Sequence, residues 1–333
     1  MKWGFHVARQ SARLCCAAAL CVLASAHAVP AGQAQDNAAT PAFRSGVDLV
    51  ALNVTLTDGQ HEFVGDLTEH DFAVFEDGVK QDLSFFAFGR VPLDLAILLD
   101  TSSSMIDTLQ TAQEAAIGFV ETVQPGDRIT TIQINDRADI LHPLTGDAAA
   151  AIEAIRRTKA RGATALYNGL YMAMTGMVES RRSTTEVRRQ ALVVLSDGQD
   201  TSSLLALDEV MALAKESGIA VYTIALLSPL EIRRLANPKY KYFAQSQFVM
   251  KSLADVTGAR AFVARNAGEL DGIYRTIADE LAHQYTLGYV SKSKRRDDGF
   301  RRVIVQVVDR PDVQTRTRTG YQTPRPRPAP VLP

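Results

Sequence analysis

Five oxygen-bearing side chains in three separate segments have the types and spacing of a divalent-cation site. The first segment is a short apolar run that ends in Asp100, Ser102 and Ser104. The second is a loop that offers Thr164, and the third is another apolar run that ends in Asp197. Carboxylate and hydroxyl oxygens, with no Cys or His among them, suit Mg²⁺ or Ca²⁺ better than zinc. The five residues therefore predict a metal site for Mg²⁺, with Ca²⁺ or Mn²⁺ as alternatives.

The elements that carry these residues are predicted to be parallel strands. Apolar runs of strand length alternate with helical patterns between residues 93 and 283, which is typical of a parallel sheet covered by helices on both faces. Parallel strands end at one edge of a sheet, so we expect Asp100 and Asp197 to approach each other there. Two such carboxylates repel each other, and a divalent cation between them removes that cost. A cation held in this way can accept a carboxylate from another molecule.

The pattern resembles the metal-ion-dependent adhesion site of the von Willebrand factor type A domain. That family carries Asp-x-Ser-x-Ser after its first strand, a Thr in a Gly-x-Thr-like loop, and an Asp-Gly after a later strand. The five residues named above stand in that order and at similar separations. The resemblance covers roughly residues 93–283. It implies a Rossmann-like α/β fold and a metal-mediated binding role, with no established chemistry.

The flanks resemble an exported bacterial family, the VWFA-related proteins of the acidobacterial type. LTEHDFAVFEDGVKQDLSFF precedes the α/β block, and YTLGYVSKS followed by GFRRVIVQV comes after it. Both flanks alternate apolar and polar residues as strands do. We therefore expect a small β module built from residues 43–90 and 285–323, with the domain 91–284 inserted into it; two separate β appendages are the alternative. The charged cluster Lys292–Arg302 is expected to form a hairpin loop.

Length, composition and the first residues set expectations about the class of protein and its location. The chain has 333 residues, 46% of them hydrophobic, and a net charge of −1, which argues against a nucleic-acid partner. Residues 1–28 combine a positive start, an apolar stretch and the small-residue site Ala26-His27-Ala28, which predicts a secretory signal peptide. All three cysteines lie in this leader, so the mature chain has no disulfide. We expect a periplasmic, cell-envelope or extracellular protein without a transmembrane span after cleavage.

Three further segments are expected to lie outside the regular elements. Residues 29–42 are small and polar and predict a flexible spacer, and residues 324–333 predict a proline-rich tail. The basic and aromatic segment Ser228–Gln247 is a long insertion, and loops of that length often serve as lids or partner surfaces.

The preferred functional hypothesis is a non-enzymatic binding module whose metal coordinates an Asp or Glu of a protein partner. A metal-dependent hydrolase is one alternative, because Asp and Mg²⁺ at a strand end also serve phosphoryl transfer. Against it, the sequence has no second Asp two residues after Asp100, no phosphate-binding Gly-x-x-x-x-Gly-Lys loop and no Gly-x-Ser-x-Gly elbow. The other alternative is an envelope assembly scaffold that works through its β module. Asp200 and Ser202 either support the metal site or belong to a solvated loop.

Overall fold

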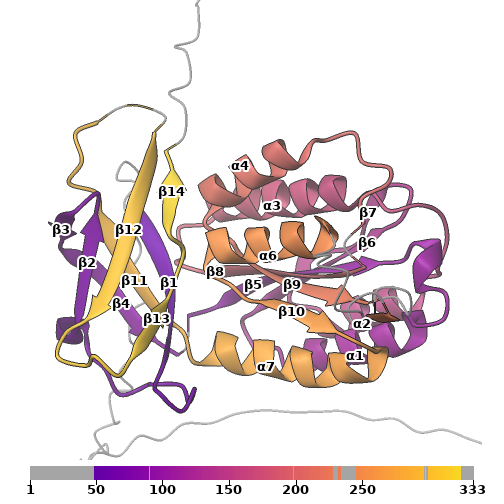
Figure 1. Cartoon of the computed structure of the whole chain (residues 1–333), viewed down its shortest axis with the longest axis horizontal. Coiled ribbons are helices and arrows are strands. Elements are labelled where there is room, and N and C mark those ends of the chain that lie inside the picture. The colour runs from indigo at the N-terminus through magenta and orange to yellow at the C-terminus, as the bar shows by residue number, and fades with distance from the viewer. Residues whose placement is uncertain are drawn as a thin grey trace, which may run out of the picture. The chain divides into compact units, whose positions relative to one another are not determined.

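The computed structural model describes residues 49–89, 91–197, 199–227, 232–233, 245–295, 297 and 299–323, which belong to one compact unit. These residues form an α/β domain with a six-stranded sheet and two four-stranded antiparallel sheets (Figure 1). The predicted leader, the spacer, most of the 228–247 insertion and the proline-rich tail lie outside the described residues.

The six-stranded sheet is mostly parallel, as predicted. Its strand order is β10-β9-β8-β5-β6-β7, and only the pair of β6 and β7 is antiparallel. The strands are β5 (Leu93–Asp100), β6 (Arg128–Ile134), β7 (Ala138–Thr145), β8 (Arg189–Ser196), β9 (Ala220–Leu226) and β10 (Ala261–Ala264). The first and third segments of the predicted metal site follow β5 and β8, which are direct neighbours in this sheet.

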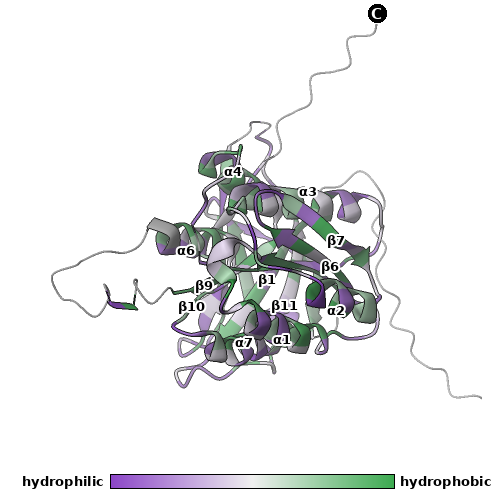
Figure 2. Ribbon diagram, turned by 90° about the vertical axis from the view of Figure 1, so that its right-hand side faces the viewer, coloured by the Kyte–Doolittle hydropathy of each residue, from purple (hydrophilic) through white to green (hydrophobic). Residues whose placement is uncertain are grey.

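Helices cover both faces of the sheet (Figures 1 and 2). One face packs against α1 (Leu109–Val120), α2 (Ala148–Arg156) and α7 (Leu270–Ala282). The other packs against α3 (Leu166–Arg182), α4 (Leu207–Ser217) and α6 (Gln245–Thr257). Every residue of β5 is buried, because helices cover both faces of a central strand in such a sheet. Its Leu95, Ile97 and Leu99 enter one apolar core and its Ala96 and Leu98 the other, as the two-residue period of a strand requires.

The two flanks of the α/β domain form the antiparallel sheets together. Their strand orders are β13-β1-β11-β4 and β14-β12-β2-β3. The strands before the domain are β1 (Leu49–Thr57), β2 (Phe72–Glu76), β3 (Val79–Gln81) and β4 (Leu83–Phe88). Those after it are β11 (Tyr285–Val290), β12 (Phe300–Val307), β13 (Gln314–Arg316) and β14 (Gly320–Gln322). Side chains of both flanks share one apolar core, which confirms the predicted fold class. Residues 49–89 and 285–323 are called the β module below.

The prediction that Lys292–Arg302 forms a hairpin loop was wrong. β11 pairs with β1 and β4, whereas β12 pairs with β2 and β14. The charged segment between β11 and β12 therefore crosses from one sheet to the other. A polar loop between two apolar runs does not reveal which partners the flanking strands choose, because strand pairing is decided by contacts between residues far apart in the sequence.

The β module contacts the amino-terminal edge of the six-stranded sheet through buried polar side chains. Glu280 of α7 is fully buried, and its Oε1 accepts a hydrogen bond from the hydroxyl of Tyr222 on β9 at 2.6 Å. Gln284 donates to the hydroxyl oxygens of Tyr222 at 3.0 Å and of Thr55 on β1 at 3.2 Å. These contacts tie the end of α7 to the module.

Candidate metal site

Three of the five predicted ligands meet at the carboxyl end of β5. Asp100 is fully buried, and its Oδ1 accepts a hydrogen bond from the backbone N–H of Ser102 at 2.9 Å. The chain then enters a short 3₁₀ turn, Ser103–Met105, in which the Oγ atoms of Ser102 and Ser104 lie 2.9 Å apart. The buried side chain of Met105 anchors this turn in the apolar core beneath it. Two hydroxyls and a carboxylate are thereby gathered on one loop.

The loop that carries Thr164 is hydrogen-bonded to this first segment. The backbone N–H of Ser103 donates to the carbonyl of Gly162 at 3.0 Å, and the N–H of Arg161 donates to the carbonyl of Thr101 at 2.8 Å. Thr164 itself is buried and lies two residues before α3. Its side chain makes no hydrogen bond to the other four predicted ligands within the described residues, so the backbone of its loop holds it beside them.

Gly162 is required for the shape of this loop. Its φ is +73°, which L side chains rarely adopt, and a Cβ there would lie 2.2 Å from Oδ2 of Asp136. Asp136 also accepts a hydrogen bond at Oδ1 from the backbone N–H of Ala163 at 2.7 Å. The carboxylate therefore fixes the loop from outside, and its close approach leaves room only for a glycine.

The third segment follows β8 and is hydrogen-bonded to the second. Asp197 is half-buried, and its Oδ1 accepts a hydrogen bond from the N–H of Gln199 at 3.1 Å. The N–H of Thr164 donates to Oγ1 of Thr201 at 2.9 Å, and the N–H of Thr201 donates to the carbonyl of Thr164 at 2.9 Å. The three segments are thus joined in series at the carboxyl edge of the sheet, on the side that faces the viewer in Figure 2.

The electrostatics of this edge favour a cation. Burial raises the pKa of Asp100, hydrogen bonds from Ser196 and Ser102 oppose that rise, and the charge of Asp197 adds to it. The two carboxylates are therefore close enough to act on each other. No group of three or more His, Cys, Asp or Glu side chains in the described part of the chain could hold a metal. The predicted donor set of two carboxylates plus hydroxyls fits a hard divalent cation that keeps some of its waters.

The sequence of this region matches a known family model. Residues 94–276 match the von Willebrand factor type A domain. The chain belongs to the von Willebrand factor type A family. Domains of this family are generally protein-interaction modules and not enzymes. Within the described residues, no helix has both the length and the apolar character needed to cross a membrane.

Relatives of this von Willebrand factor type A chain occur in several bacteria. The uncharacterized protein sll0103 of Synechocystis sp. is 34% identical over 114 residues, which cover 33% of this chain and 26% of sll0103. A UPF0353 protein of Mycolicibacterium paratuberculosis is 24% identical over 220 residues, which cover 60% of this chain and 65% of that protein. The chain thus spans less than two thirds of either relative. A solved von Willebrand factor type A structure from Catenulispora acidiphila is 13% identical, with a TM-score of 0.48, over 84% of this chain and 75% of that one.

Ser196, which contacts Asp100 directly, was not among the site residues predicted from the sequence. Ser196 is fully buried at the last position of β8, and its hydroxyl donates to Oδ2 of Asp100 at 2.6 Å. With the N–H of Ser102 on the other oxygen, both oxygens of this carboxylate are held in place. The signal in the sequence is a polar residue that closes an otherwise apolar strand just before Asp197.

Asp200 and Ser202 support the loops of the von Willebrand factor type A domain. Oδ1 of Asp200 accepts hydrogen bonds from the N–H of Tyr167 at 3.2 Å and from the hydroxyl of Ser203 at 2.6 Å. The N–H of Ser202 donates to the carbonyl of Thr164 at 3.1 Å. Asp200 therefore caps the amino terminus of α3 from another loop, which holds the Thr164 segment against the third segment.

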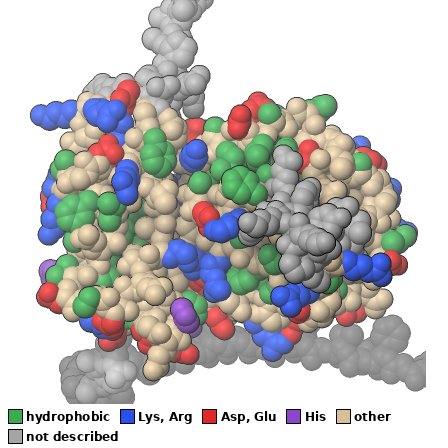
Figure 3. Space-filling model, in the orientation of Figure 1, with side chains coloured by type: hydrophobic (Ala, Val, Ile, Leu, Met, Phe, Trp, Pro, Cys, Tyr) green, Lys and Arg blue, Asp and Glu red, His purple; other side chains and the backbone are tan. Residues whose placement is uncertain are grey.

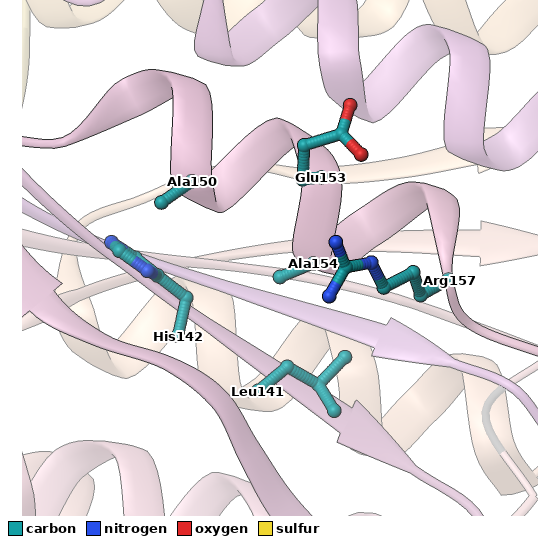
Figure 4. A pocket seen from close by; sticks show the side chains of 6 residues that line it. All are labelled: Leu141, His142, Ala150, Glu153, Ala154 and Arg157. Atoms are coloured by element: carbon teal, nitrogen blue, oxygen red, sulfur yellow. The ribbon is translucent and has the colours of Figure 1, made fainter.

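A cavity of about 450 Å³ lies elsewhere in the domain, between β7 and α2 (Figure 4). Its lining residues are Leu141, His142, Ala150, Glu153, Ala154 and Arg157. Nε2 of His142 lies 2.9 Å from Oγ1 of Thr145, and Glu153 pairs with Arg156 at 2.7 Å. None of the predicted metal ligands lines this cavity.

Proposed function

We propose that the chain mediates divalent-metal-dependent binding to a protein partner, and that the metal coordinates an Asp or Glu of that partner. The observation that carries the proposal is the chain of hydrogen bonds that joins the Asp100, Thr164 and Asp197 segments at one sheet edge. Membership of a family of interaction modules supports the same role.

Each predicted ligand has a distinct task in this proposal. Asp100 and Asp197 would balance the charge of the cation, and the hydroxyls of Ser102, Ser104 and Thr164 would add neutral oxygen ligands. Mg²⁺ is the first candidate and Ca²⁺ or Mn²⁺ are the alternatives. When bound, the cation supplies an electrophilic position that a carboxylate from outside can occupy. Ser196 orients Asp100 and does not itself need to touch the metal.

Two exposed apolar side chains on the loops of the site favour a protein as the ligand. Ile106 follows Ser104 by two residues and is 69% exposed, and Leu204 is 95% exposed on the loop that caps α3. Apolar contacts around a central polar anchor are typical of protein–protein interfaces. The predicted leader supports a place of action outside the cytoplasm.

Calorimetric titration of the full chain with MgCl₂ tests the metal site. We expect saturable binding to the parent chain and its loss in Asp100→Asn. Asp107→Asn is the matched control, because Asp107 is an exposed carboxylate close by in the sequence that is no predicted ligand. Equal Mg²⁺ binding by Asp100→Asn would contradict the proposal.

The binding role is tested by recovering partners from an envelope extract with and without EDTA. We expect partner recovery to depend on the divalent cation and to be lost in Asp100→Asn but kept in Asp107→Asn. Recovery that is insensitive to both EDTA and Asp100→Asn would show that the interaction does not use the metal.

A further inference from the structure

Two arginine side chains converge where the β module meets α3 and α4. Arg181 lies in the last turn of α3, and Arg318 lies between β13 and β14. Gly218, which ends α4, sits between them: Nη1 of Arg318 is 3.0 Å and Nη1 of Arg181 is 3.8 Å from the position that a Cβ on Gly218 would take. Gly218 precedes β9, so this point is at the amino-terminal edge of the sheet, opposite the predicted metal ligands.

Neither arginine is balanced by a carboxylate within the described residues. Arg181 donates to the carbonyl of Ser217 at 2.8 Å, and Arg318 donates to the carbonyl of Ala51 at 2.9 Å. Nε of Arg318 is buried and has no hydrogen-bond partner in the described part of the chain. Because a guanidinium carries five N–H donors, most donors of both side chains have no hydrogen-bond acceptor among the described residues. Arg316, only two residues from Arg318, differs because it pairs with Glu280.

The two positive charges also act on each other. Burial lowers the pKa of Arg318 to about 10, and the charge of Arg181 contributes to that fall. Lys and Arg side chains gather at the surface over the border between the β module and the α/β domain (Figure 3). Folding therefore brings the guanidinium groups of Arg181 and Arg318 together without pairing either with a carboxylate of the described residues, which raises the free energy of the folded chain.

We propose that Arg181 and Arg318 bind a phosphate or sulfate group at this border. The planar fork of a guanidinium matches the oxygen pairs of such groups, and two forks that converge can hold one group from two sides. Since Arg181 belongs to the α/β domain and Arg318 to the β module, the bound oxyanion would bridge the two. The site is independent of the proposed metal site.

Thermal unfolding of the full chain at constant ionic strength tests the proposal, with sodium chloride replaced stepwise by sodium phosphate or sodium sulfate. We expect a saturable rise of the midpoint in the parent chain, because a ligand that binds the folded state stabilises it. The rise should vanish in Arg181→Gln/Arg318→Gln and persist in Arg137→Gln, which replaces an exposed arginine of the opposite edge. A rise that does not saturate, or that is equal in the double variant, would overturn the proposal.

A second measurement covers the case in which the double variant does not fold. Calorimetric titration of the parent chain with inorganic phosphate should show one site, and the absence of binding would overturn the proposal without any variant. Titration with glycerol phosphate distinguishes the source of the group. Tighter binding than inorganic phosphate would assign the site to a phosphate carried by a larger molecule, and weaker binding to the free ion.

Discussion

The carboxylate of Glu280, fully buried in the last turn of α7, pairs with the guanidinium of Arg316 on β13 at 2.5 Å. The other oxygen, Oε1, accepts the hydrogen bond from Tyr222. Nη1 of Arg260 lies 3.9 Å from Oε2, the oxygen that pairs with Arg316. A buried carboxylate needs such partners, because desolvation penalises its charge. One ion pair thus joins the α/β domain to the β module, and its carboxylate is shielded from solvent.

Removing the guanidinium should destabilise the chain more than its partial exposure would indicate. We expect Arg316→Met to lower the free energy of unfolding by about 2–3 kcal/mol, because it leaves Glu280 charged and buried. Urea denaturation measures the loss. Arg310→Met, which breaks an exposed pair with Asp312, should cost much less, because solvent screens that pair. Adding Glu280→Gln to Arg316→Met should restore part of the stability, and no recovery would argue against an uncompensated charge as the cause.

Ser196→Ala should weaken metal binding without unfolding the chain. The substitution removes the hydrogen bond to Oδ2 of Asp100 and keeps the small size of the side chain. Loss of a residue that orients a metal ligand typically costs about 10–100-fold in affinity. Calorimetric titration with MgCl₂ gives the change, and circular dichroism confirms the fold. Ser183→Ala, on an exposed loop after α3, is the control and should bind Mg²⁺ as the parent does.

Gly162→Ala should disturb the Thr164 loop. A methyl group would meet the Asp136 carboxylate, and the positive φ would be strained in addition. We expect the free energy of unfolding to fall by about 1–2 kcal/mol and Mg²⁺ affinity to fall with it. Gly118→Ala makes the same change within α1, where a Cβ meets nothing within 4 Å, and should stabilise the chain by up to about 1 kcal/mol. Unchanged Mg²⁺ affinity in Gly162→Ala would show that the Thr164 loop does not contribute to metal binding.

Leu204→Asp should reduce partner binding while the fold and the metal site stay intact. The side chain is almost fully exposed, so the free energy of unfolding should change by less than about 0.5 kcal/mol. A carboxylate there would repel the acidic residue that we expect on the partner. Val79→Asp places the same charge on an exposed apolar position of the β module and should leave binding unchanged. Equal partner recovery with both variants would show that Leu204 does not contribute to partner binding.

Acid should reduce the stability that the Asp297 carboxylate gives to the segment between β11 and β12. Hydrogen bonds from Arg301 and Arg295 lower the pKa of Asp297 to about 2, below its usual 3.8. The unfolded chain therefore binds more protons at this group, and its stabilising effect is full above pH about 4 and disappears as the pH falls toward 2. Asp297→Asn should be less stable than the parent at pH 6, and the difference in urea midpoint should shrink as the pH falls from about 4 through 2. A constant difference across that range would contradict this role.

The α/β domain could be predicted because its sequence signals are local and strong. The apolar runs that end in Asp100 and Asp197 mark buried strands, and the order of such strands along the chain fixes the edge at which they end. The prediction of Asp100 and Asp197 rests on that logic, whereas Ser102, Ser104 and Thr164 rest on their spacing and on the resemblance to the family motif; the binding measurements proposed above are the test of all five.

The supporting contacts could not be predicted, because they join residues far apart in the sequence. Asp136, Ser196 and Thr201 each look like ordinary polar residues at the end of a strand or in a loop, and only the fold brings them to Ala163, Asp100 and Thr164. The short strands β3, β13 and β14 have three residues each, too few for a period of two to appear. The assignment of β11 and β12 to different sheets likewise depends on long-range packing.

The last strand before the α/β domain and the first strand after it are antiparallel neighbours. Phe88 at the end of β4 is the register partner of Tyr285 at the start of β11. The chain therefore leaves the β module and returns to it at adjacent points, as in a hairpin whose turn has been replaced by a whole domain. From an engineering standpoint, a tight turn between these two residues would close the module on itself, and the same two points would accept a different domain as a graft.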